Sequence, residues 1–585
     1  MSILRHVSAR QESEAADRQP PIGLGANSLQ SELLGLEQLE ERARALAAEF
    51  TLARRHRGPA YPLQSLAENA RRLRHAYRTF AVDIRRGVAS PPASEWLLDN
   101  FHLVEAEIRN VAHDLPSRYY LELPKLAARD FAGTARVYAM AVELLRHSDA
   151  RLDLVRLTRF MNAYQTVAPL SIGELWAWPS MLKLALLEHV RRIADELLAS
   201  RAARLEADER FAAFERARAA GGPPELPPSF HVAFVDQLLQ RMREYGAGSA
   251  ELRQRLEERL GLAQASVEDA VRAEHQRQAT GHVSMGNSIT SLRLCATLDW
   301  NLYVERVSLV EQILRRDPPG VYARMEFASR DRYRQAVEEL SEPTGEAQVR
   351  VALRAIESAR QAAERVGIDA KAAHVGHHLI GPGRRELEID VAYHPHFARR
   401  VRRFIFAQAT PFYLGSIALL TLLGMTLAVG IAGELHAGSW ARLWVAVVAA
   451  IPASDLAVSL MQRLVHRLAS PRKLPRLDLR GGVPEAARTM VIVPCLLPSA
   501  DVARALVERL EVHALGNMDR NLHFALLTDF PDAPTEHRAE DDAALAAARA
   551  GIEALNDHYA PADRDRFYLF HRARRWNPSE GVWMG

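Results

Sequence analysis

An aspartate that follows an apolar run is the residue of this sequence best suited to chemistry. Residues 522–527 have the length and composition of a short buried strand, and Thr528, Asp529 and Phe530 follow directly. A carboxylate at the carboxyl end of a parallel strand can accept hydrogen bonds from the uracil or ribose of a nucleotide sugar. The alternative is a solvated aspartate in a turn, which produces the same pattern. Asp532 lies nearby and is the weaker candidate of the two.

A group of histidines could also hold a metal ion. Its members are His374, His377, His378, His394 and His396. Two of these imidazoles could share one face of a helix. No carboxylate or cysteine has a spacing that would complete a ligand set, and the Gly-Pro-Gly at 381–383 indicates a helix end or a loop. We therefore expect no metal ligand in this chain.

Five segments around Asp529 alternate between strand and helix patterns. The predicted order is a strand at 489–494, a helix at 501–514, a strand at 522–527, a helix at 543–556 and a strand at 567–570. This βαβαβ series predicts a parallel sheet, and ligands of such sheets gather at the carboxyl ends of the strands. Pro494 and Asp529 are expected at two of these ends. We assign residues 484–585 to the beginning of an α/β domain.

The first two thirds of the chain read as helical. Residues 1–30 are polar and rich in Gly, Pro and Ser, which predicts a disordered tail. Residues 31–398 carry apolar stripes at helical spacing, and the clearest stripe consists of Leu97, Phe101, Val104, Ile108 and Val111. Ser94 is the expected N-cap of that helix. We predict one large all-α domain that packs and positions the rest of the chain, with a break into two subdomains near 220–228.

A long uncharged segment predicts entry into a membrane. No charged residue lies between Arg403 and Glu434, and a second apolar stretch at 440–460 follows after a short connector. A bilayer core requires about 20 apolar residues of helix, so residues 404–465 are predicted to form a transmembrane hairpin. Asp455 is the awkward residue of the second span, and we expect it to reach the interface or pair with Arg463 rather than to serve as a functional acid.

The charges that flank the hairpin predict its orientation. Arginines and a lysine cluster on both sides, at Arg399, Arg400, Arg402, Arg403, Arg463, Arg467, Arg472, Lys473 and Arg476. The positive-inside rule places both long flanks in the cytoplasm.

A net charge of only +3 with no basic block elsewhere argues against nucleic acid as a partner. The sequence also contains neither a nucleophile-elbow motif nor a phosphate-binding glycine-rich loop, which argues against hydrolases and ATPases.

Several segments of this chain resemble the bacterial cyclic β-1,2-glucan synthases. They are residues 101–109, 114–126, 169–176, 285–293 and 321–327 in the helical region, and residues 476–480, 522–532 and 574–583 after the hairpin. The resemblance extends over almost everything after about residue 30. Because several long motifs follow one another in the order of that family, the resemblance is specific.

The resemblance implies an enzyme of the bacterial inner membrane that transfers glucose from UDP-glucose to a growing β-1,2-glucan. Residues 484–585 would then begin a GT-A-like glycosyltransferase domain, with the nucleotide sugar, the glucan chain and the rest of the synthase as partners. Asp529 matches a position that contacts the nucleotide, and Pro494 would shape the first strand end of this donor site. A divalent metal, Mg²⁺ or Mn²⁺, is expected in the full-length enzyme only.

The resemblance also indicates what this sequence lacks. No segment matches the acidic metal motif, the catalytic base or the anchor residue of the family, so no catalytic residue is assigned within these 585 residues. We therefore expect a piece of a synthase or one subunit of a split enzyme, which is inactive alone. The alternative is a non-catalytic, membrane-anchored scaffold that docks a separate glycosyltransferase.

Overall fold

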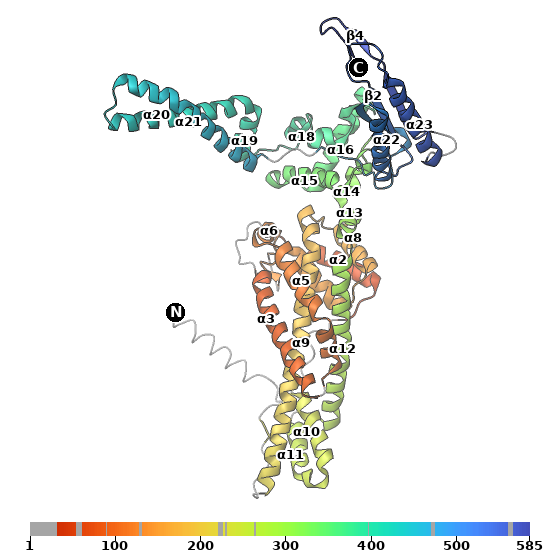
Figure 1. Cartoon of the computed structure of the whole chain (residues 1–585). Helices are drawn as coiled ribbons and strands as arrows, with labels where there is room; N and C mark the ends of the chain where they lie inside the picture. The colour runs from red at the N-terminus through yellow and green to blue at the C-terminus, as the bar shows by residue number, and fades with distance from the viewer. Residues whose placement is uncertain are drawn as a thin grey trace. The chain divides into compact units, whose positions relative to one another are not determined.

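The chain forms two compact units in a computed structural model (Figure 1). The structure describes residues 32–53, 61–88, 90–127, 131–219, 226–227, 231–262, 265–395, 397–469, 474–559 and 565–585. The first unit comprises Met1–Gly320 and Tyr333–Arg402, and the second comprises Val321–Arg332 and Arg403–Gly585. The predicted tail at 1–30, most of the predicted break at 220–228, and His396 lie outside the described residues.

In its described residues the first unit consists of helices, with isolated bridges between some of its loops. The helices are α2 (Leu36–Glu49), α3 (Tyr61–Arg85), α4 (Pro92–Asp99), α5 (Phe101–Asp114), α6 (Ser117–Glu122), α7 (Arg136–Ser148), α8 (Leu154–Gln165), α9 (Ile172–Ala219), α10 (Val232–Tyr245), α11 (Ala250–Leu262), α12 (Val267–Thr297), α13 (Trp300–Val307), α14 (Leu309–Leu314), α16 (Gln348–Val366), α17 (Val375–Leu379) and α18 (Arg384–Asp390). Helix α15 (Phe327–Thr344) begins in the second unit and ends in the first. The predicted all-α region is thereby confirmed.

Among the buried side chains of the described helical unit, two clusters lie along its longest helices. The larger cluster includes Phe160, Trp178 and Leu292, and the smaller one gathers Phe211 and Phe234 with their neighbours. Helices α9 and α12 are long, lie side by side, and contribute to both clusters (Figure 1). The two cores therefore share a continuous helical framework, because the same two helices run through both of them.

The helix predicted across residues 94–111 is divided in the structure. Helix α4 ends at Asp99 and α5 begins at Phe101, with Asn100 as the residue between them. Ser94 is not the N-cap: Pro91 occupies that position, and the Ser94 hydroxyl donates to the Pro91 carbonyl. The apolar stripe still faces the core, since Leu97 and Val104 are fully buried. A spacing of three and four residues can thus continue across a short interruption.

A buried ion pair fixes the beginning of the long helix α9. Arg136 donates from Nε to Glu174 Oε1 at 2.8 Å and from Nη2 to Glu174 Oε2 at 2.6 Å. Ser171 donates to the same carboxylate from its backbone N–H at 2.9 Å and from its hydroxyl at 3.0 Å. Removing one partner of such a pair would leave a buried charge without a counterion. The segment at 169–176 therefore has a structural role.

The second unit joins a short segment before the hairpin to the chain that follows it. The backbone N–H of Glu326 donates to the carbonyl of Arg476 at 3.0 Å, and that of Asp478 donates to the carbonyl of Arg324 at 2.8 Å. An isolated antiparallel bridge pairs Met325 with Leu477. Residues 321–332, which the sequence placed with the helical domain at 31–398, are therefore grouped with the chain after the hairpin.

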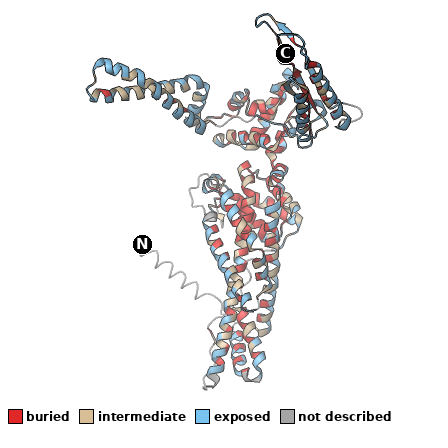
Figure 2. Ribbon diagram, in the orientation of Figure 1, coloured by how far each residue is buried: buried red, intermediate tan, exposed pale blue. Residues whose placement is uncertain are grey.

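Two apolar helices form the predicted hairpin. Helix α20 (Ala409–Glu434) has 26 residues and α21 (Ser439–Leu468) has 30, so both are long enough to cross a bilayer. Their side chains are mostly exposed, which suits contact with lipid (Figure 2). Asp455 is exposed, and no ion pair joins it to Arg463 among the described residues. The suggested pairing of these two residues is therefore not observed.

The hairpin helices approach each other closely at small residues. A Cβ atom added to Gly424 on α20 would lie 2.9 Å from Cβ of Ala453 on α21. Helices in lipid associate through such close backbone contacts, because the surrounding lipid tails are as apolar as the side chains. Gly415, on the same helix, has no atom within 4 Å of the corresponding position. The contact is therefore local to Gly424.

The final part of the second unit contains the predicted parallel sheet. Its strands β1 (Thr489–Leu496), β2 (Leu522–Asp529) and β3 (Phe567–Arg572) lie in the order β1-β2-β3 and are parallel. The connecting helices are α22 (Ala500–Leu515) and α23 (Asp541–Tyr559). The βαβαβ prediction is confirmed, and each strand is two residues longer than predicted. A hairpin of β4 (Arg575–Asn577) and β5 (Val582–Met584) was not predicted.

The two faces of the parallel sheet differ in burial. Val507 and Ile552, from the two connecting helices, pack in one cluster with Phe524 and Phe567 of the strands, so both helices cover the same face. Side chains that alternate with these point to the opposite face. That face is apolar and open, because Ile492, Leu527 and Phe570 are 50%, 43% and 44% exposed.

Substitution of Gly424 tests the packing of the hairpin. We expect Gly424→Val to lower the unfolding temperature of the detergent-solubilised protein, since overpacking costs about 1–3 kcal/mol. Gly415→Val is the matched control on the same helix and should leave the temperature within about a degree, because its added side chain meets open space. Thermal unfolding followed by intrinsic fluorescence measures both. Equal effects of the two substitutions would contradict the contact.

Candidate functional site

The carboxyl edge of the parallel sheet brings the predicted aspartate next to an arginine. Asp529 is the last residue of β2 and pairs in register with Leu496 of β1 and Arg572 of β3. The Arg572 guanidinium donates from Nε to Asp529 Oδ1 at 3.1 Å and from Nη2 to Asp529 Oδ2 at 2.8 Å. The side chains are 64% exposed for Arg572 and 27% exposed for Asp529. A charged pair therefore stands at the open edge of the sheet.

Pro494 is close to this edge but not at it. Strand β1 continues two residues beyond it, to Leu496, and Pro494 pairs in register with Leu527 of β2. Strand β1 is an edge strand of the described sheet, which is a position where a residue without an N–H group is tolerated. Whether Pro494 takes part in ligand binding stays a prediction.

A threonine and a histidine reinforce the strands behind the charged pair. The Thr528 hydroxyl lies 3.0 Å from His571 Nδ1 and donates to the Phe570 carbonyl at 3.2 Å. The ring of Phe530 packs edge-on against that of His571, with centroids 4.3 Å apart. Burial lowers the pKa of His571, although the nearby Asp529 carboxylate acts in the opposite direction. We infer that this imidazole is neutral at pH 7 and serves to order the strand ends.

A buried arginine fixes the loop that follows Asp529. Arg574 is fully buried and donates from Nη2 to Asp541 Oδ1 at 3.0 Å, with a second contact from Nη1 to the same carboxylate. It also donates to the carbonyls of Pro531 at 2.6 Å and Glu536 at 3.1 Å. The guanidinium lies 5.0 Å from the centroid of the Phe530 ring. One side chain thus connects β3 to both ends of the loop between β2 and α23.

The weaker candidate, Asp532, belongs to this loop and contacts the end of the β4–β5 hairpin. Its Oδ1 accepts from the backbone N–H of Gly585 at 3.1 Å. Ala533 and Trp583 exchange backbone hydrogen bonds of 2.9 Å, which attaches β5 to the loop. Arg572 donates to the Gly585 carbonyl at 2.8 Å. Asp532 therefore stabilises the surroundings of Asp529 in this structure.

Two of the histidines considered as metal ligands make structural contacts. His374 is the N-cap of α17, and its Nδ1 accepts from the backbone N–H of Gly376 at 2.8 Å. His378 is buried, with Nε2 at 3.0 Å from the Ala372 carbonyl. No group of three or more His, Cys, Asp or Glu side chains that could hold a metal ion occurs among the residues that the structure describes.

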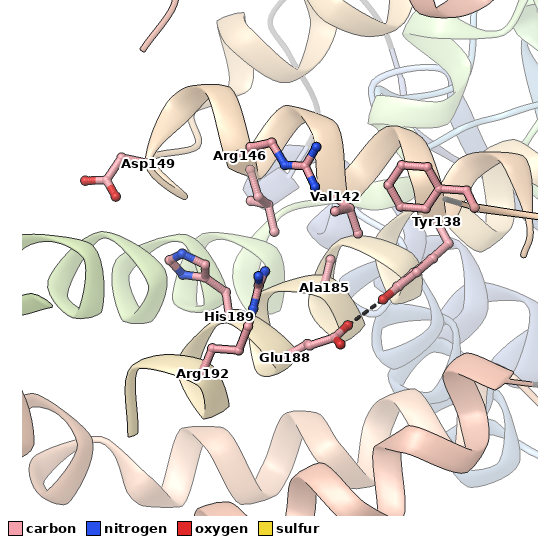
Figure 3. Close-up of a pocket in the computed structure, with 10 residues that line it drawn as sticks. Tyr138, Val142, Arg146, Asp149, Ala185, Glu188, His189 and Arg192 are labelled. Atoms are coloured by element: carbon pink, nitrogen blue, oxygen red, sulfur yellow. Dashed lines mark hydrogen bonds between the residues drawn. The ribbon is translucent and has the colours of Figure 1, made fainter. Parts of the chain in front are cut away.

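The helical unit contains a cavity of about 200 Å³ between α7 and α9 (Figure 3). Its polar lining includes Tyr138, Arg146, Asp149, Glu188, His189 and Arg192. The Tyr138 hydroxyl donates to the Glu188 carboxylate, and His189 Nδ1 lies 2.9 Å from the Ser288 hydroxyl. Burial lowers the pKa of His189 to about 4, so its imidazole is neutral at pH 7.

Asp149, the second acidic residue of this cavity, is also engaged within the protein. Asp149 accepts from the side-chain amide of Asn287 at 3.0 Å and from the hydroxyl of Ser284. Asp149 and Ala150 both have a positive φ, of 49° and 54°, and such backbone strain requires support from its surroundings. Ser291 supplies part of that support by donating to the Ala150 carbonyl at 2.6 Å. The polar residues of segment 285–293 thus hold the α7–α8 connection, which favours a structural role for this region.

The sequence identified Asp529 but not the arginines that surround it. Asp541 lies 12 residues after Asp529, Arg572 lies 43 after it and Arg574 lies 45 after it. Only the fold brings these residues together. The available signal was the position of Arg572 two residues after the third apolar run, as Asp529 lies two residues after the second. Arg574 could not be recognised, because a buried arginine and a solvated one look alike in a sequence.

The buried pair predicts a pH dependence of stability. The hydrogen bond from Arg574 holds the pKa of Asp541 below its usual value, so the pair contributes fully above the unfolded-state pKa of about 3.9 and less as the pH falls through the folded-state pKa. The stability difference between the native protein and Asp541→Asn should therefore be constant above about pH 5 and narrow below about pH 4. Thermal unfolding at several pH values measures this.

Asp542→Asn is the matched control for that experiment, because Asp542 is the adjacent residue and is exposed. It should change the unfolding temperature little at any pH. If the difference in stability between the native protein and Asp541→Asn increased as the pH falls, the stabilising role of the Arg574–Asp541 pair would be contradicted.

Comparison with known sequences gives one informative match. No family model matches the chain. The chain is 35% identical over 532 residues to the cyclic beta-(1,2)-glucan synthase NdvB of Rhizobium meliloti (strain 1021). The match covers 88% of this chain and 18% of that relative, so the chain spans less than a fifth of the length of the protein that it matches. The extent and identity of this match show that the chain belongs to the cyclic β-1,2-glucan synthase family.

Proposed function

We propose that this chain is part of a membrane-bound glucosyltransferase that takes UDP-glucose as donor and extends a β-1,2-glucan. Its membership of the cyclic β-1,2-glucan synthase family supports the reaction class, and its two apolar helices support the membrane location. The observation that carries the proposal for the donor site is the position of Asp529, at the carboxyl edge of a parallel sheet.

The pair of Asp529 and Arg572 offers an acceptor for the nucleoside and a donor for the diphosphate of a nucleotide sugar. Each carboxylate oxygen of Asp529 can accept more than one hydrogen bond, so its contacts with Arg572 leave capacity for a ribose hydroxyl or the uracil N–H. The planar guanidinium of Arg572 can donate to phosphate oxygens in a forked geometry. We assign Asp529 to the nucleoside and Arg572 to the diphosphate.

The proposed transfer forms one bond and breaks one. An acceptor hydroxyl of the glucan attacks the anomeric carbon of glucose, the bond from that carbon to the diphosphate oxygen breaks, and UDP leaves with the electron pair. A base must take the proton of the attacking hydroxyl. The described residues contain no acidic cluster for the Mg²⁺ or Mn²⁺ expected in the full-length enzyme, so we derive no step through a metal. That this chain binds donor but does not transfer glucose stays a prediction.

We also propose the orientation of the hairpin. The arginines that precede α20 and follow α21 favour cytoplasmic flanks, in a bacterial inner membrane. UDP-glucose is found in the cytoplasm, so a sheet on the cytoplasmic side of the membrane could bind this donor directly. The glucan chain and the remainder of the synthase are the proposed partners.

A non-catalytic scaffold is the second candidate function. The observation that favours it is the open apolar face of the parallel sheet, which includes Ile492, Leu527 and Phe570. Exposed apolar patches of this kind commonly mark a surface that another element covers. The scaffold would dock a separate glycosyltransferase and would itself bind no nucleotide sugar.

Binding of UDP-glucose separates the two candidates. Isothermal titration calorimetry on the purified, detergent-solubilised chain, with Mg²⁺ or Mn²⁺ present, should show binding that Asp529→Ala weakens at least about tenfold, because the nucleoside loses its acceptor. Asp557→Ala is the control. Asp557 is exposed near the carboxyl end of α23, which leads to the beginning of β3 and not to the strand end that carries Asp529. Absence of binding by the native chain would favour the scaffold.

Substitution of Arg572 tests the division of roles within the site. We expect Arg572→Gln to weaken the binding of UDP and UDP-glucose several-fold, while uridine, which lacks the diphosphate, keeps its affinity. The same calorimetric titrations with all three ligands measure this. If uridine loses as much affinity as UDP, then Arg572 acts by orienting Asp529 and not by binding phosphate.

A further inference from the structure

A short basic helix precedes the first apolar span. Helix α19 (Phe397–Ala407) ends one residue before α20, and Gln408 is the only residue between the two helices. Four of its apolar side chains are exposed: Phe397 by 82%, Phe404 by 66%, Phe406 by 46% and Val401 by 40%. Contact between several phenylalanine side chains and water is unfavourable, so an exposed apolar surface of this kind commonly marks an interaction site.

Most of the apolar and basic residues of α19 lie on different sides of the helix. At about 100° per residue, Phe397, Val401 and Phe404 fall within an arc of about 60°. Arg399, Arg402 and Arg403 fall on the other side of the helix, together with Phe406, and Arg400 lies at the border of the apolar arc. A basic helix with an apolar face and a polar face is the type that lies in the interface plane of a membrane.

The position of α19 in the chain agrees with that interpretation. Because α20 is long enough to cross a bilayer, the carboxyl end of α19 lies where the chain enters the membrane. The exposed apolar side chains are therefore within reach of the same bilayer. At the other end, Arg399 forms an ion pair with Glu339 at 3.2 Å, which ties the first turn of α19 to α15.

We propose that α19 lies along the membrane surface and binds anionic phospholipids. Phe397, Val401 and Phe404 would lie among the acyl chains, and the arginines would lie at the level of the headgroup phosphates. Polybasic segments beside a membrane span are attracted to anionic lipid. Arg400 illustrates the available capacity: its Nε donates to the Pro395 carbonyl at 3.1 Å, and a guanidinium carries five N–H donors. The proposal depends on the membrane location of the chain and not on the donor site.

Depth-dependent fluorescence quenching tests this proposal on the full chain. The variants Val401→Cys, Phe404→Cys and Arg402→Cys, each in a background with Cys295→Ala and Cys495→Ser, would be labelled with a bimane at the introduced thiol. The labelled protein would be reconstituted in vesicles of phosphatidylcholine, or of phosphatidylcholine with one quarter phosphatidylglycerol, that contain lipid with a doxyl quencher on the acyl chain. Labels at 401 and 404 should be quenched at least about twice as strongly as the label at 402.

The lipid composition separates the two parts of the proposal. Quenching at 404 should increase with phosphatidylglycerol and decrease at high salt, and Arg400→Gln with Arg402→Gln should remove that increase while leaving the quenching in phosphatidylcholine. Equal quenching at 402 and 404, or none at either, would overturn the surface location of α19. An increase that survives the arginine substitutions would overturn the binding of anionic lipid. UDP-glucose affinity serves as an independent readout of the donor site in the same samples.

Discussion

The buried contact between Arg574 and Asp541 is the interaction on which the proposed donor site depends. Arg574 comes from the segment after β3, Asp541 begins α23, and the same guanidinium holds two carbonyls of the loop between β2 and α23. Because the arginine is fully buried, it must stay paired, and this requirement fixes the loop. The open edge of the sheet therefore presents Asp529 and Arg572 from a rigid support, which is what recognition of a ligand requires.

The helical unit is also stabilised by a buried ion pair, but this pair does not support the edge of a sheet. The Arg136 and Glu174 pair is buried where α9 begins, and the serines and asparagine of α12 hold the connection between α7 and α8. Segments of this unit that resemble the synthase family thus have roles in packing. In the cavity between α7 and α9, Tyr138 donates to Glu188 and Asp149 accepts from Ser284. The chemistry that we propose is accordingly located after the hairpin.

The sequence predicted those features that depend on local pattern. The uncharged run of α20, the alternation of strands and helices, and Asp529 at a strand end could all be read from neighbouring residues. Features that depend on distant contacts were missed. The pairing of residues 321–332 with the chain after α21, the break at Asn100 and the burial of Arg574 follow from packing between segments far apart in the sequence.

The central claim is that the carboxyl edge of the parallel sheet receives UDP-glucose. Hydrogen–deuterium exchange of the solubilised chain, with and without UDP-glucose, tests this claim most directly because it locates the ligand without a substitution. We predict slower exchange in the segments around residues 528–541 and 571–575, and unchanged exchange in α9 and α12. Slower exchange confined to the helical unit, or no change at saturating ligand, would contradict it.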